Sequence, residues 1–352
     1  MSRFDPTLPL ERARTIPSGW YTDRQFHLAE GGLVFARSWQ CVGRAEQVSE
    51  SGQFLTADIA GEPVLVVRGD DGELRGFFNV CRHRAAPILT APVGCVSKLR
   101  CHYHGWTYDL AGKLKGTPEF DGVCDFDKAE NGLVPVGGVE IAGPFVWVHL
   151  LKPERPVVEE FAPFFARSNF AGLRYHSSSS YTLNCNWKVY IDNYLDGGYH
   201  VNTVHPALAG VIDYKHYRTE LFDRCNVQTS PLTPGDGAVG ATRTGDAAYW
   251  WLWPNFTVNL YAGVMDTNLV LPLDQERCKV VFDFYFGPDA TPDFIRDSVS
   301  VANTVQDEDI LICEQVQRGL HSRSYDTGRF SVKREAGGYQ FHRLLAAALS
   351  PG

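Results

Sequence analysis

The chain has 352 residues, 44% of them hydrophobic and 21% charged, which is enough for two soluble domains with sizeable cores. Its formal net charge of −8 argues against nucleic acid and anionic membranes as partners and suits a cationic small molecule. No run of eighteen apolar residues could span a membrane, and the N-terminus lacks the apolar segment of a signal peptide. Nine scattered cysteines form no closely spaced framework, so we expect free or metal-bound thiols in a cytoplasmic protein.

The chain begins with a predicted helical lead-in and continues with β-strands. Residues 1–37 contain a capping-box signal at Thr22–Gln25, followed by Phe26, Ala29 and Leu33 at helical spacing. Short runs rich in β-forming residues, separated by hairpin sequences such as Gly-Asp-Asp-Gly, then cover residues 53–59, 63–67 and 74–80. These runs predict an all-β domain that starts near residue 38.

Two short motifs that each hold one cysteine and one histidine follow the last of these strands. They read Cys81-x-His83 and Cys101-x-x-His104, with seventeen residues between them. Two thiolates and two imidazoles are the ligands of a Rieske [2Fe–2S] centre, in which two His replace two Cys on one iron. The alternative is a structural zinc site, but zinc motifs usually keep like ligands together. One Cys and one His in each loop therefore favour the iron–sulfur cluster.

Basic residues crowd the two loops of this predicted cluster. They are Arg82, Arg84, Lys98 and Arg100. Positive charge there should favour the reduced cluster, or form a docking face for an acidic electron donor, and both interpretations can hold together.

A second domain of mixed type follows the all-β domain. Hairpin signals at 107–114 and 139–151 complete the first domain, and the Pro-rich residues 152–156 indicate a boundary near 150. The remainder is mostly helical at 187–210, strand-rich at 249–286, and helical again over a long amphipathic stretch at 291–320. The predicted fold class is thus α+β: a lead-in at 1–37, a Rieske [2Fe–2S] domain at 38–150, and a catalytic domain of antiparallel sheet plus helices at 151–352.

One motif in the second domain resembles a nucleotide-binding fingerprint. Gly235 to Gly240 match G-x-G-x-x-G, but neither the strand before it nor the helix after it is indicated. We interpret this stretch as a flexible loop, and no flavin or nicotinamide site is visible elsewhere.

A candidate site for a second metal lies in the helical stretch. His200 and His205 are separated by four residues, and non-haem Fe(II) that activates O2 is bound by two His and one carboxylate. This spacing does not align on a straight helix, so we expect a kink or loop between the two imidazoles. The third ligand is predicted from the acidic run before the apolar helix face, with Asp309 favoured over Glu308. The alternative is a pair of ordinary surface histidines.

These motifs identify the chain as similar to the Rieske-type oxygenases, the aromatic-ring-hydroxylating family, and most similar to its choline monooxygenases. The stretches DNYLDGGYH at 192–200 and DTNLVLPL at 266–273 carry this narrower likeness. The resemblance implies that Cys81, His83, Cys101 and His104 bind the cluster, and that His200, His205 and Asp309 hold the mononuclear iron.

The resemblance also implies a carboxylate just before the first iron histidine, which links that iron to a cluster histidine of a neighbouring subunit. Here Asp196 stands four residues before His200, where most relatives have three, and Gly197 occupies the usual position. A helix N-cap is the alternative role for Asp196. Asn193 and Asp196 are our predicted catalytic residues.

An aromatic run in the second domain suggests how a cation is bound. It covers Tyr249 to Phe256, and Tyr261 follows. A quaternary ammonium offers no N–H donors and is recognised by aromatic faces. Alternation along a strand puts Tyr249, Trp251 and Trp253 on one face. With Tyr261 they are the predicted substrate residues, although packing in a sheet core would explain the same pattern.

We therefore predict a monooxygenase that hydroxylates choline or a related quaternary ammonium with O2, in a homotrimer supplied with electrons by a ferredoxin or flavin reductase. The resemblance implies the homotrimer and the external reductant. The alternatives are an oxygenase of aromatic acids, a Rieske electron carrier in which the paired histidines are structural, and a zinc-containing binding module.

Overall fold

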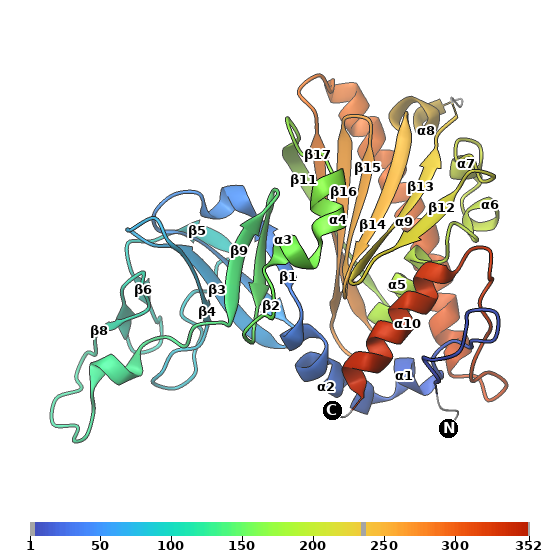
Figure 1. Ribbon diagram of the computed structural model, residues 1–352. Coiled ribbons are helices and arrows are strands. Elements are labelled where there is room, and N and C mark those ends of the chain that lie inside the picture. The colour runs from blue at the N-terminus through green and yellow to red at the C-terminus, as the bar shows by residue number, and fades with distance from the viewer. Residues whose placement is uncertain (1–3, 234–236, 351–352) are drawn as a thin grey trace. The chain divides into compact units, whose positions relative to one another are not determined.

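The computed structural model describes residues 4–233 and 237–350, and the chain divides into two compact units (Figure 1). One unit is Phe35–Glu160; the other unites Met1–Val34 with Phe161–Gly352. The smaller unit thus extends to Glu160, where the sequence predicted a boundary near 150. Among the described residues no helix combines the length and apolar character needed to cross a membrane.

The smaller unit is built from short antiparallel strands, as predicted. One sheet has the order β4-β3-β2-β5 and the others β1-β10-β9 and β6-β7-β8. The strands are β1 Gln40–Arg44, β2 Gln53–Ile59, β3 Glu62–Arg68, β4 Leu74–Phe78, β5 Val93–Cys95, β6 Leu99–Arg100, β7 Thr107–Tyr108, β8 Leu114–Gly116, β9 Gly138–Ala142 and β10 Phe145–His149. The unit also contains short helical segments: η1 Phe35–Arg37, η2 Ala45–Val48, η3 Lys128–Asn131 and α3 Val157–Glu160.

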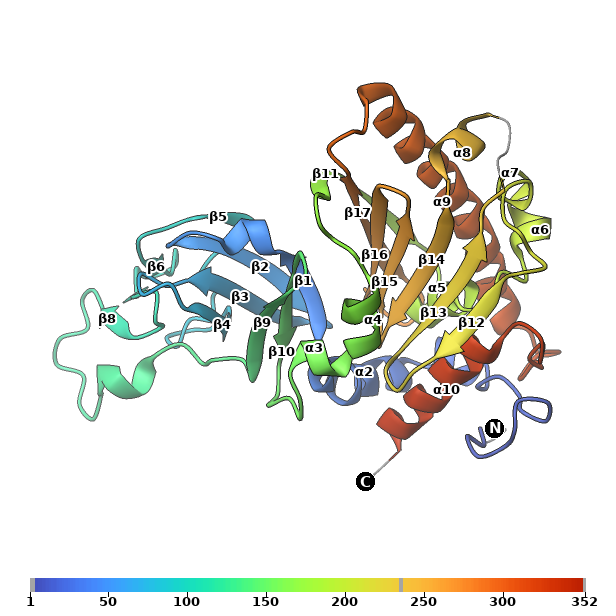
Figure 2. The same ribbon diagram turned by 45° about the horizontal axis from the view of Figure 1, so that its top comes forward.

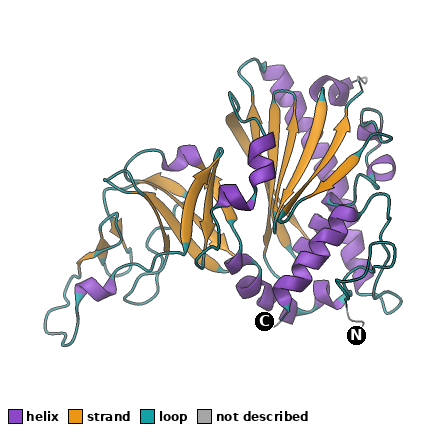
Figure 3. Ribbon diagram, viewed as in Figure 1, coloured by secondary structure: helices purple, strands orange, loops and turns teal. Residues whose placement is uncertain are grey.

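The larger unit is a seven-stranded antiparallel sheet with helices packed on it, within the described ranges (Figure 3). The strand order is β11-β17-β16-β15-β14-β13-β12. The strands are β11 Arg174–Leu183, β12 Arg218–Leu221, β13 Cys225–Pro231, β14 Asp246–Leu252, β15 Phe256–Tyr261, β16 Val264–Pro272 and β17 Cys278–Phe286. Together the two units confirm the predicted α+β class.

The helices of the larger unit come from both ends of the chain. They are α1 Gly19–Thr22, α2 Arg24–Leu33, α4 Ala162–Arg167, α5 Trp187–Tyr194, α6 Val201–Val204, α7 Pro206–Ala209, α8 Gly237–Thr242, α9 Pro292–Leu320 and α10 Ala336–Leu349. Helix α9 runs along one face of the sheet in both views (Figures 1 and 2). On the opposite face, Phe164 of α4 packs edge-to-face on Trp250 of β14.

Local signals explain where the longest helices begin. Thr291 caps α9 by accepting a hydrogen bond from the Phe294 N–H, and Pro292 occupies the first turn. For α2 the cap is Asp23, which accepts from the Gln25 N–H, rather than Thr22 of the predicted capping box. Asn186 caps α5 in the same way through the Lys188 N–H.

The stretch that resembled a nucleotide fingerprint contains a short helix. Gly235 and Asp236 lie outside the described residues, and α8 covers Gly237–Thr242 where the sequence predicted a flexible loop.

Candidate functional site

The two Cys–His loops of the smaller unit present their thiols inward and their imidazoles outward. Cys81 and Cys101 are 3% and 2% exposed within the core of the unit. His83 and His104 lie toward the surface, and their Nδ1 atoms are 3.1 Å apart. Such a set fits a cluster with one iron bound by two inner thiolates and the other by two outer imidazoles.

Each loop is a closed turn that fixes the position of its cysteine. The Cys81 N–H donates to the Ala86 carbonyl, and the Cys101 N–H donates to the Trp106 carbonyl. The Tyr108 hydroxyl accepts from the Arg82 N–H at 3.1 Å and lies 3.5 Å from the Cys81 sulfur, so its hydrogen is free to point at that sulfur. Hydrogen bonds of this kind tune the reduction potential of an iron–sulfur centre.

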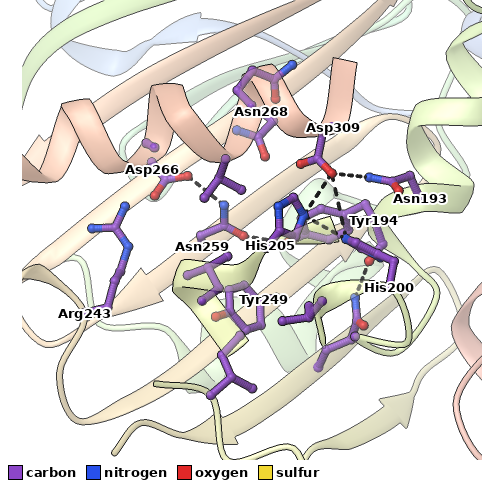
Figure 4. Close-up of a pocket in the computed structure, with 18 of the residues that line it drawn as sticks. Asn193, Tyr194, His200, His205, Arg243, Tyr249, Asn259, Asp266, Asn268 and Asp309 are labelled. Carbon is purple, nitrogen blue, oxygen red and sulfur yellow. Dashed lines mark hydrogen bonds and ion pairs between the residues drawn. The ribbon is translucent and has the colours of Figure 1, made fainter. Parts of the chain in front are cut away.

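In the larger unit, His200, His205 and Asp309 converge on one point (Figure 4). The two Nε2 atoms are 3.0 Å apart, and Asp309 Oδ1 lies 3.2 Å from His205 Nε2 and 3.8 Å from His200 Nε2. When both rings carry their proton on Nδ1, three lone pairs face one another, which is favourable only around a cation. Two imidazoles and one carboxylate form the facial donor set of non-haem Fe(II).

Each of these three side chains is held by a further polar partner. Asp196 Oδ2 lies 2.6 Å from His200 Nδ1, and Glu308 Oε2 lies 2.6 Å from His205 Nδ1. Both carboxylates thereby place the imidazole proton on Nδ1 and leave Nε2 as the ligand atom. Asn193 Nδ2 donates to Asp309 Oδ1 at 2.7 Å. Glu308, the carboxylate that the sequence analysis ranked below Asp309 as an iron ligand, is half-buried against His205.

A glycine pair shapes the chain between α5 and the first histidine. Gly197 and Gly198 have φ of 72° and 70°, a region that favours glycine. A Cβ on Gly197 would lie 2.1 Å from the Arg334 carbonyl oxygen. Asp196 accepts hydrogen bonds from the Tyr199 and His200 N–H groups across this turn, so it caps the turn and orients His200 as well.

The irregularity predicted between the two histidines is present. His200 is the N-cap of the short helix α6 and His205 is its C-cap. His205 has φ −117° and ψ 75° and stands immediately before Pro206. The chain bends there, and both rings consequently point to the same side, where α9 supplies Asp309.

A pocket extends from these three residues across the face of the sheet on which α9 lies (Figure 4). Among the described residues, its aromatic lining consists of Tyr190, Tyr194, Tyr217, Tyr249, Tyr261 and Phe282. Tyr249 stacks on Tyr217 at 6.3 Å and meets Tyr261 edge-on at 5.9 Å between ring centroids. Burial raises the pKa of Tyr249 well above its usual value and that of Tyr261 to about 12, so both rings are neutral phenols.

The structure brings only part of the predicted aromatic set to this pocket. Tyr249 and Tyr261 line it, whereas Trp251 and Trp253 do not. Trp251 shares the face of Tyr249 but lies under Phe341 of α10, at 5.7 Å between ring centroids. Trp253 follows the end of β14 and packs on Trp251. Both tryptophans are buried in the core and lie outside the pocket lining, contrary to the prediction that they contact the substrate.

A chain of hydrogen-bonded polar side chains crosses the floor of the pocket. Antiparallel pairing places Gln228, Tyr249, Asn259 and Asp266 opposite one another on four neighbouring strands. Asn259 donates to Asp266 Oδ1 at 2.7 Å and accepts from the Tyr194 hydroxyl at 2.8 Å. Burial raises the pKa of the Asp266 carboxyl, and the nearby Arg243 guanidinium and the Asn259 amide oppose that rise.

Arg243 is the cationic member of the pocket lining among the described residues. It is 4% exposed, donates to Ser298 Oγ at 2.8 Å and lies over the Tyr261 ring at 4.5 Å from its centroid. We identified neither Arg243 nor Asp266 as a site residue from the sequence. The available signal was the presence of Asp266 and Asn268 at alternate positions of a strand whose other residues, apart from Thr267, are apolar.

Two protein families match this chain in sequence. The model described as Ring hydroxylating alpha subunit (catalytic domain) matches residues 170–350, and the Rieske [2Fe-2S] domain matches residues 38–127. The chain belongs to the Rieske-type ring-hydroxylating oxygenases. It is accordingly an oxidoreductase whose cofactors are a Rieske [2Fe–2S] cluster and a mononuclear iron.

Members of this family that act on quaternary ammonium compounds are similar over nearly the whole chain. The chloroplastic choline monooxygenase of Arabidopsis thaliana is 40% identical, over 98% of this chain and 85% of that protein. The carnitine monooxygenase oxygenase subunit of Escherichia coli K12 is 30% identical, over 96% and 94%.

Solved structures agree with this relationship. A quaternary ammonium Rieske monooxygenase in complex with L-carnitine is 27% identical, with a TM-score of 0.87 over 99% of this chain and all of that chain. Naphthalene 1,2-dioxygenase from Rhodococcus sp., at 19% identity and a TM-score of 0.79, covers 96% and 95% and shares the fold.

Proposed function

We propose that the protein is a monooxygenase that hydroxylates choline, or a close quaternary ammonium alcohol, at the carbon bearing the hydroxyl group. The observation that carries this proposal is the pocket beside His200, His205 and Asp309, which combines tyrosine faces with the buried carboxylate Asp266. Aromatic faces and a nearby carboxylate bind a cation that has no N–H donors. The choline monooxygenase relatives support the same substrate.

The proposed reaction consumes O2 and two electrons. Choline, O2, two electrons and two protons give the hydrate of betaine aldehyde and one water, and the hydrate then loses water. When bound, the iron supplies O2 activation and the cluster supplies single electrons. In our proposal His200, His205 and Asp309 hold the iron, and Cys81, His83, Cys101 and His104 hold the cluster.

The remaining polar residues of the centre position these ligands. Asp196 and Glu308 each accept the Nδ1 proton of one histidine, and Asn193 fixes the Asp309 carboxylate. The tyrosines exclude water from the pocket and hold the ammonium, while Asp266 balances its charge. In this scheme Asn193 and Asp196 act on the iron ligands, and neither transfers a proton to the substrate.

We further propose an external electron donor, a ferredoxin or a flavin reductase. The side chains of Arg82, Arg84, Lys98 and Arg100 are all exposed around the outward-facing imidazoles. An acidic donor would be attracted to this face.

We also propose a homotrimer in which electrons pass from the cluster of one subunit to the iron of the next, with Asp196 as the polar link. The structure of a similar quaternary ammonium Rieske monooxygenase is described as giving insights into inter-subunit electron transfer. A cytoplasmic location remains our prediction; its support is that the nine cysteines, all within the described residues, form no disulfide.

A second candidate substrate is a betaine, which carries a carboxylate as well as the ammonium. The buried Arg243 in the pocket lining favours it, since a guanidinium pairs well with a carboxylate.

Turnover by the reconstituted holoenzyme tests the proposal. With a surrogate reductase, O2 uptake and product formation are compared for choline, L-carnitine, glycine betaine and benzoate. We expect choline to give betaine aldehyde with matched O2 consumption. The proposal fails if no quaternary ammonium is oxidised, or if benzoate alone is turned over.

A further inference from the structure

Two buried amide groups in the pocket have no hydrogen-bond partner for their nitrogen. Asn268 and Gln306 are 2% and 1% exposed and both line the pocket. Within the described part of the chain, Asn268 Nδ2 and Gln306 Nε2 are buried without an acceptor. A buried donor left unpaired destabilises the protein, so two in one cavity indicate that a ligand supplies the acceptor.

The orientation of both amides is fixed by their oxygens. Gln306 Oε1 accepts from the Tyr190 hydroxyl at 2.8 Å, and Asn268 Oδ1 accepts from Thr257 Oγ1 at 2.9 Å. The NH2 group of each amide is therefore the part that remains available to a ligand in the cavity. A pair of donors and no spare acceptor suits a ligand oxygen with free lone pairs.

The two donors lie toward the iron ligands. Gln306 is three residues before Asp309 on α9, so the two side chains share one face of the helix within a single turn. On β16, Asn268 is two residues beyond Asp266 and on the same face of the sheet. Figure 4 shows Asn268 between Asp266 and Asp309.

The cation of the pocket lies at the other end. Arg243 is bound to Ser298, which precedes Asp309 by eleven residues on α9, about 16 Å along the helix axis. Figure 4 likewise shows Arg243 and the iron ligands at opposite ends. A substrate carboxylate would be drawn to Arg243 and repelled by Asp309. The acceptor for the two amides is therefore a neutral oxygen.

We propose that Asn268 and Gln306 form a hydroxyl-binding subsite, which accepts the alcohol oxygen of the substrate and turns its carbon toward His200, His205 and Asp309. The ammonium group then lies between this subsite and Arg243, against Tyr249 and Tyr261 and beside Asp266. This inference rests on the proposed function and adds to it the residues that hold the alcohol group of the substrate and the orientation that they impose.

Equilibrium binding to the anaerobic holoenzyme, without reductant, tests the subsite independently of turnover. Dissociation constants are measured by calorimetry for choline and for ethyltrimethylammonium, which has the same skeleton without the hydroxyl group. For the wild type we expect choline to bind at least about tenfold more tightly, because the analogue leaves both donors unpaired. Asn268→Leu and Gln306→Met should each reduce this ratio several-fold.

The two dissociation constants that form this ratio are measured on the same protein preparation. A partial loss of folded protein therefore affects both equally and leaves the ratio unchanged. Gln317→Met is the matched control: Gln317 is on the same helix, its Nε2 is also buried without a partner, and it does not line this pocket. We expect that variant to keep the wild-type ratio. Equal binding of the two ligands by the wild type, or an unchanged ratio in both subsite variants, would overturn the subsite.

The outcomes separate this inference from the proposed function. If the wild type binds both ammonium compounds equally and still oxidises choline, the subsite is wrong and the function stands. If glycine betaine binds more tightly than choline and Arg243→Met removes that preference, the oxygen lies at Arg243 and the subsite is wrong. If no quaternary ammonium binds, both proposals are wrong.

Discussion

At the scale of single residues, neighbouring carboxylates on α9 differ in what they contact. Glu308 Oε2 lies 2.6 Å from His205 Nδ1, whereas Asp307 is exposed. Removing the outer partner of a metal-binding histidine typically weakens metal affinity 10–100-fold. We therefore expect Glu308→Ala to bind Fe(II) about 10–100-fold more weakly, as measured by titration of protein stripped of its mononuclear iron.

Two controls accompany this prediction. Asp307→Ala should retain wild-type affinity for Fe(II), and the visible absorption of the cluster should be the same in both variants. An unchanged iron affinity in Glu308→Ala would show that the contact does not support the ligand.

The buried carboxylate Asp266 predicts how choline binding depends on pH. Burial raises its pKa, with the Arg243 charge and the Asn259 amide opposing the rise. As pH falls, Asp266 therefore takes up its proton at a higher pH than an exposed aspartate does. The protonated pocket would hold the ammonium beside Arg243 without a counter-charge. We expect the dissociation constant of choline to rise as pH falls through that pKa.

Asp266→Asn identifies the titrating group. Calorimetry from pH 8 down to pH 5 should show weak and pH-independent choline binding in this variant. A variant with the same pH profile as the wild type would assign the titration to another residue.

Sequence reasoning at this scale goes furthest where spacing encodes chemistry. Cys81-x-His83 and Cys101-x-x-His104 predict their ligand set locally; in the structure the two thiols lie in one core cluster, and the two imidazoles lie with their Nδ1 atoms 3.1 Å apart. Choosing Asp309 over Glu308 was harder, because adjacent residues on a helix differ by only about 100° in direction. In the structure Asp309 faces the histidine Nε2 atoms and Glu308 faces Nδ1 of His205.

The substrate pocket was predicted less well. Alternation indicates which face a strand residue occupies, but not how far along the sheet the pocket extends. Tyr249 and Trp251 share a face, yet Phe341 of α10 covers Trp251. The chain of polar side chains that includes Asn259 and Asp266 comes from several strands. The sequence of a single strand does not determine its register with its neighbours, so these contacts could not be predicted.

At the scale of elements, the connection between α5 and α6 depends on glycine. Gly197 has φ 72°, and a Cβ there would clash with the Arg334 carbonyl oxygen at 2.1 Å. Because Asp196 and His200 flank this turn, we expect Gly197→Ala to bind less mononuclear iron. We also expect it to lower the free energy of unfolding by about 1–3 kcal/mol. Iron analysis and urea unfolding measure the two effects.

Gly32 is the matched control for this substitution. It lies inside α2, and a Cβ there meets nothing within 4 Å. Gly32→Ala should therefore keep its iron and gain roughly 0.4–1 kcal/mol. A Gly197→Ala protein as stable and as iron-rich as Gly32→Ala would contradict this account of the turn.

Elements with strong periodic patterns were predicted, and those without them were missed. The predicted helix at 291–320 is α9, and the strand predicted at 53–59 is β2. The ten-residue strand β11 was not predicted, because its run of serines carries no apolar alternation. It is one of the two edge strands of this sheet, paired with β17 alone among the described strands, and nearly all of its side chains are exposed or half-buried.

At the scale of the whole molecule, a buried ion pair ties the N-terminal lead-in to the catalytic unit. Lys188 Nζ of α5 lies 2.5 Å from Glu30 Oε1 of α2, with side chains 0% and 1% exposed. Glu30 also accepts from Trp187 Nε1 at 2.7 Å. Burial lowers the pKa of Lys188. Removing one partner leaves the other charge buried and typically costs about 3–5 kcal/mol.

A double variant separates this charge effect from simple loss of packing. We expect Glu30→Gln and Lys188→Met each to lower the urea midpoint strongly. The combined variant should be more stable than the sum of the two losses implies, because it leaves no unpaired charge. Strictly additive losses would show that the two residues act independently.

The proposed transfer of electrons between subunits has a consequence for mixed assemblies. His205→Ala should keep the cluster and lose the iron, and Cys101→Ser should keep the iron and lose the cluster, so neither variant oxidises choline alone. If electrons cross to the next subunit of a cyclic trimer, co-expression of the two variants restores activity. In random assemblies at equal expression, an iron-competent subunit receives electrons from a cluster-competent neighbour at roughly a quarter of the subunit boundaries. We therefore expect about a quarter of wild-type activity per chain.

Transfer within one chain would leave the mixture inactive, because no single polypeptide then has both centres. A third co-expression, with Asp196→Asn added to the His205-intact chain, examines the link itself. Because Asp196 also supports His200, mononuclear iron is quantified in the same sample, and activity per bound iron should fall further.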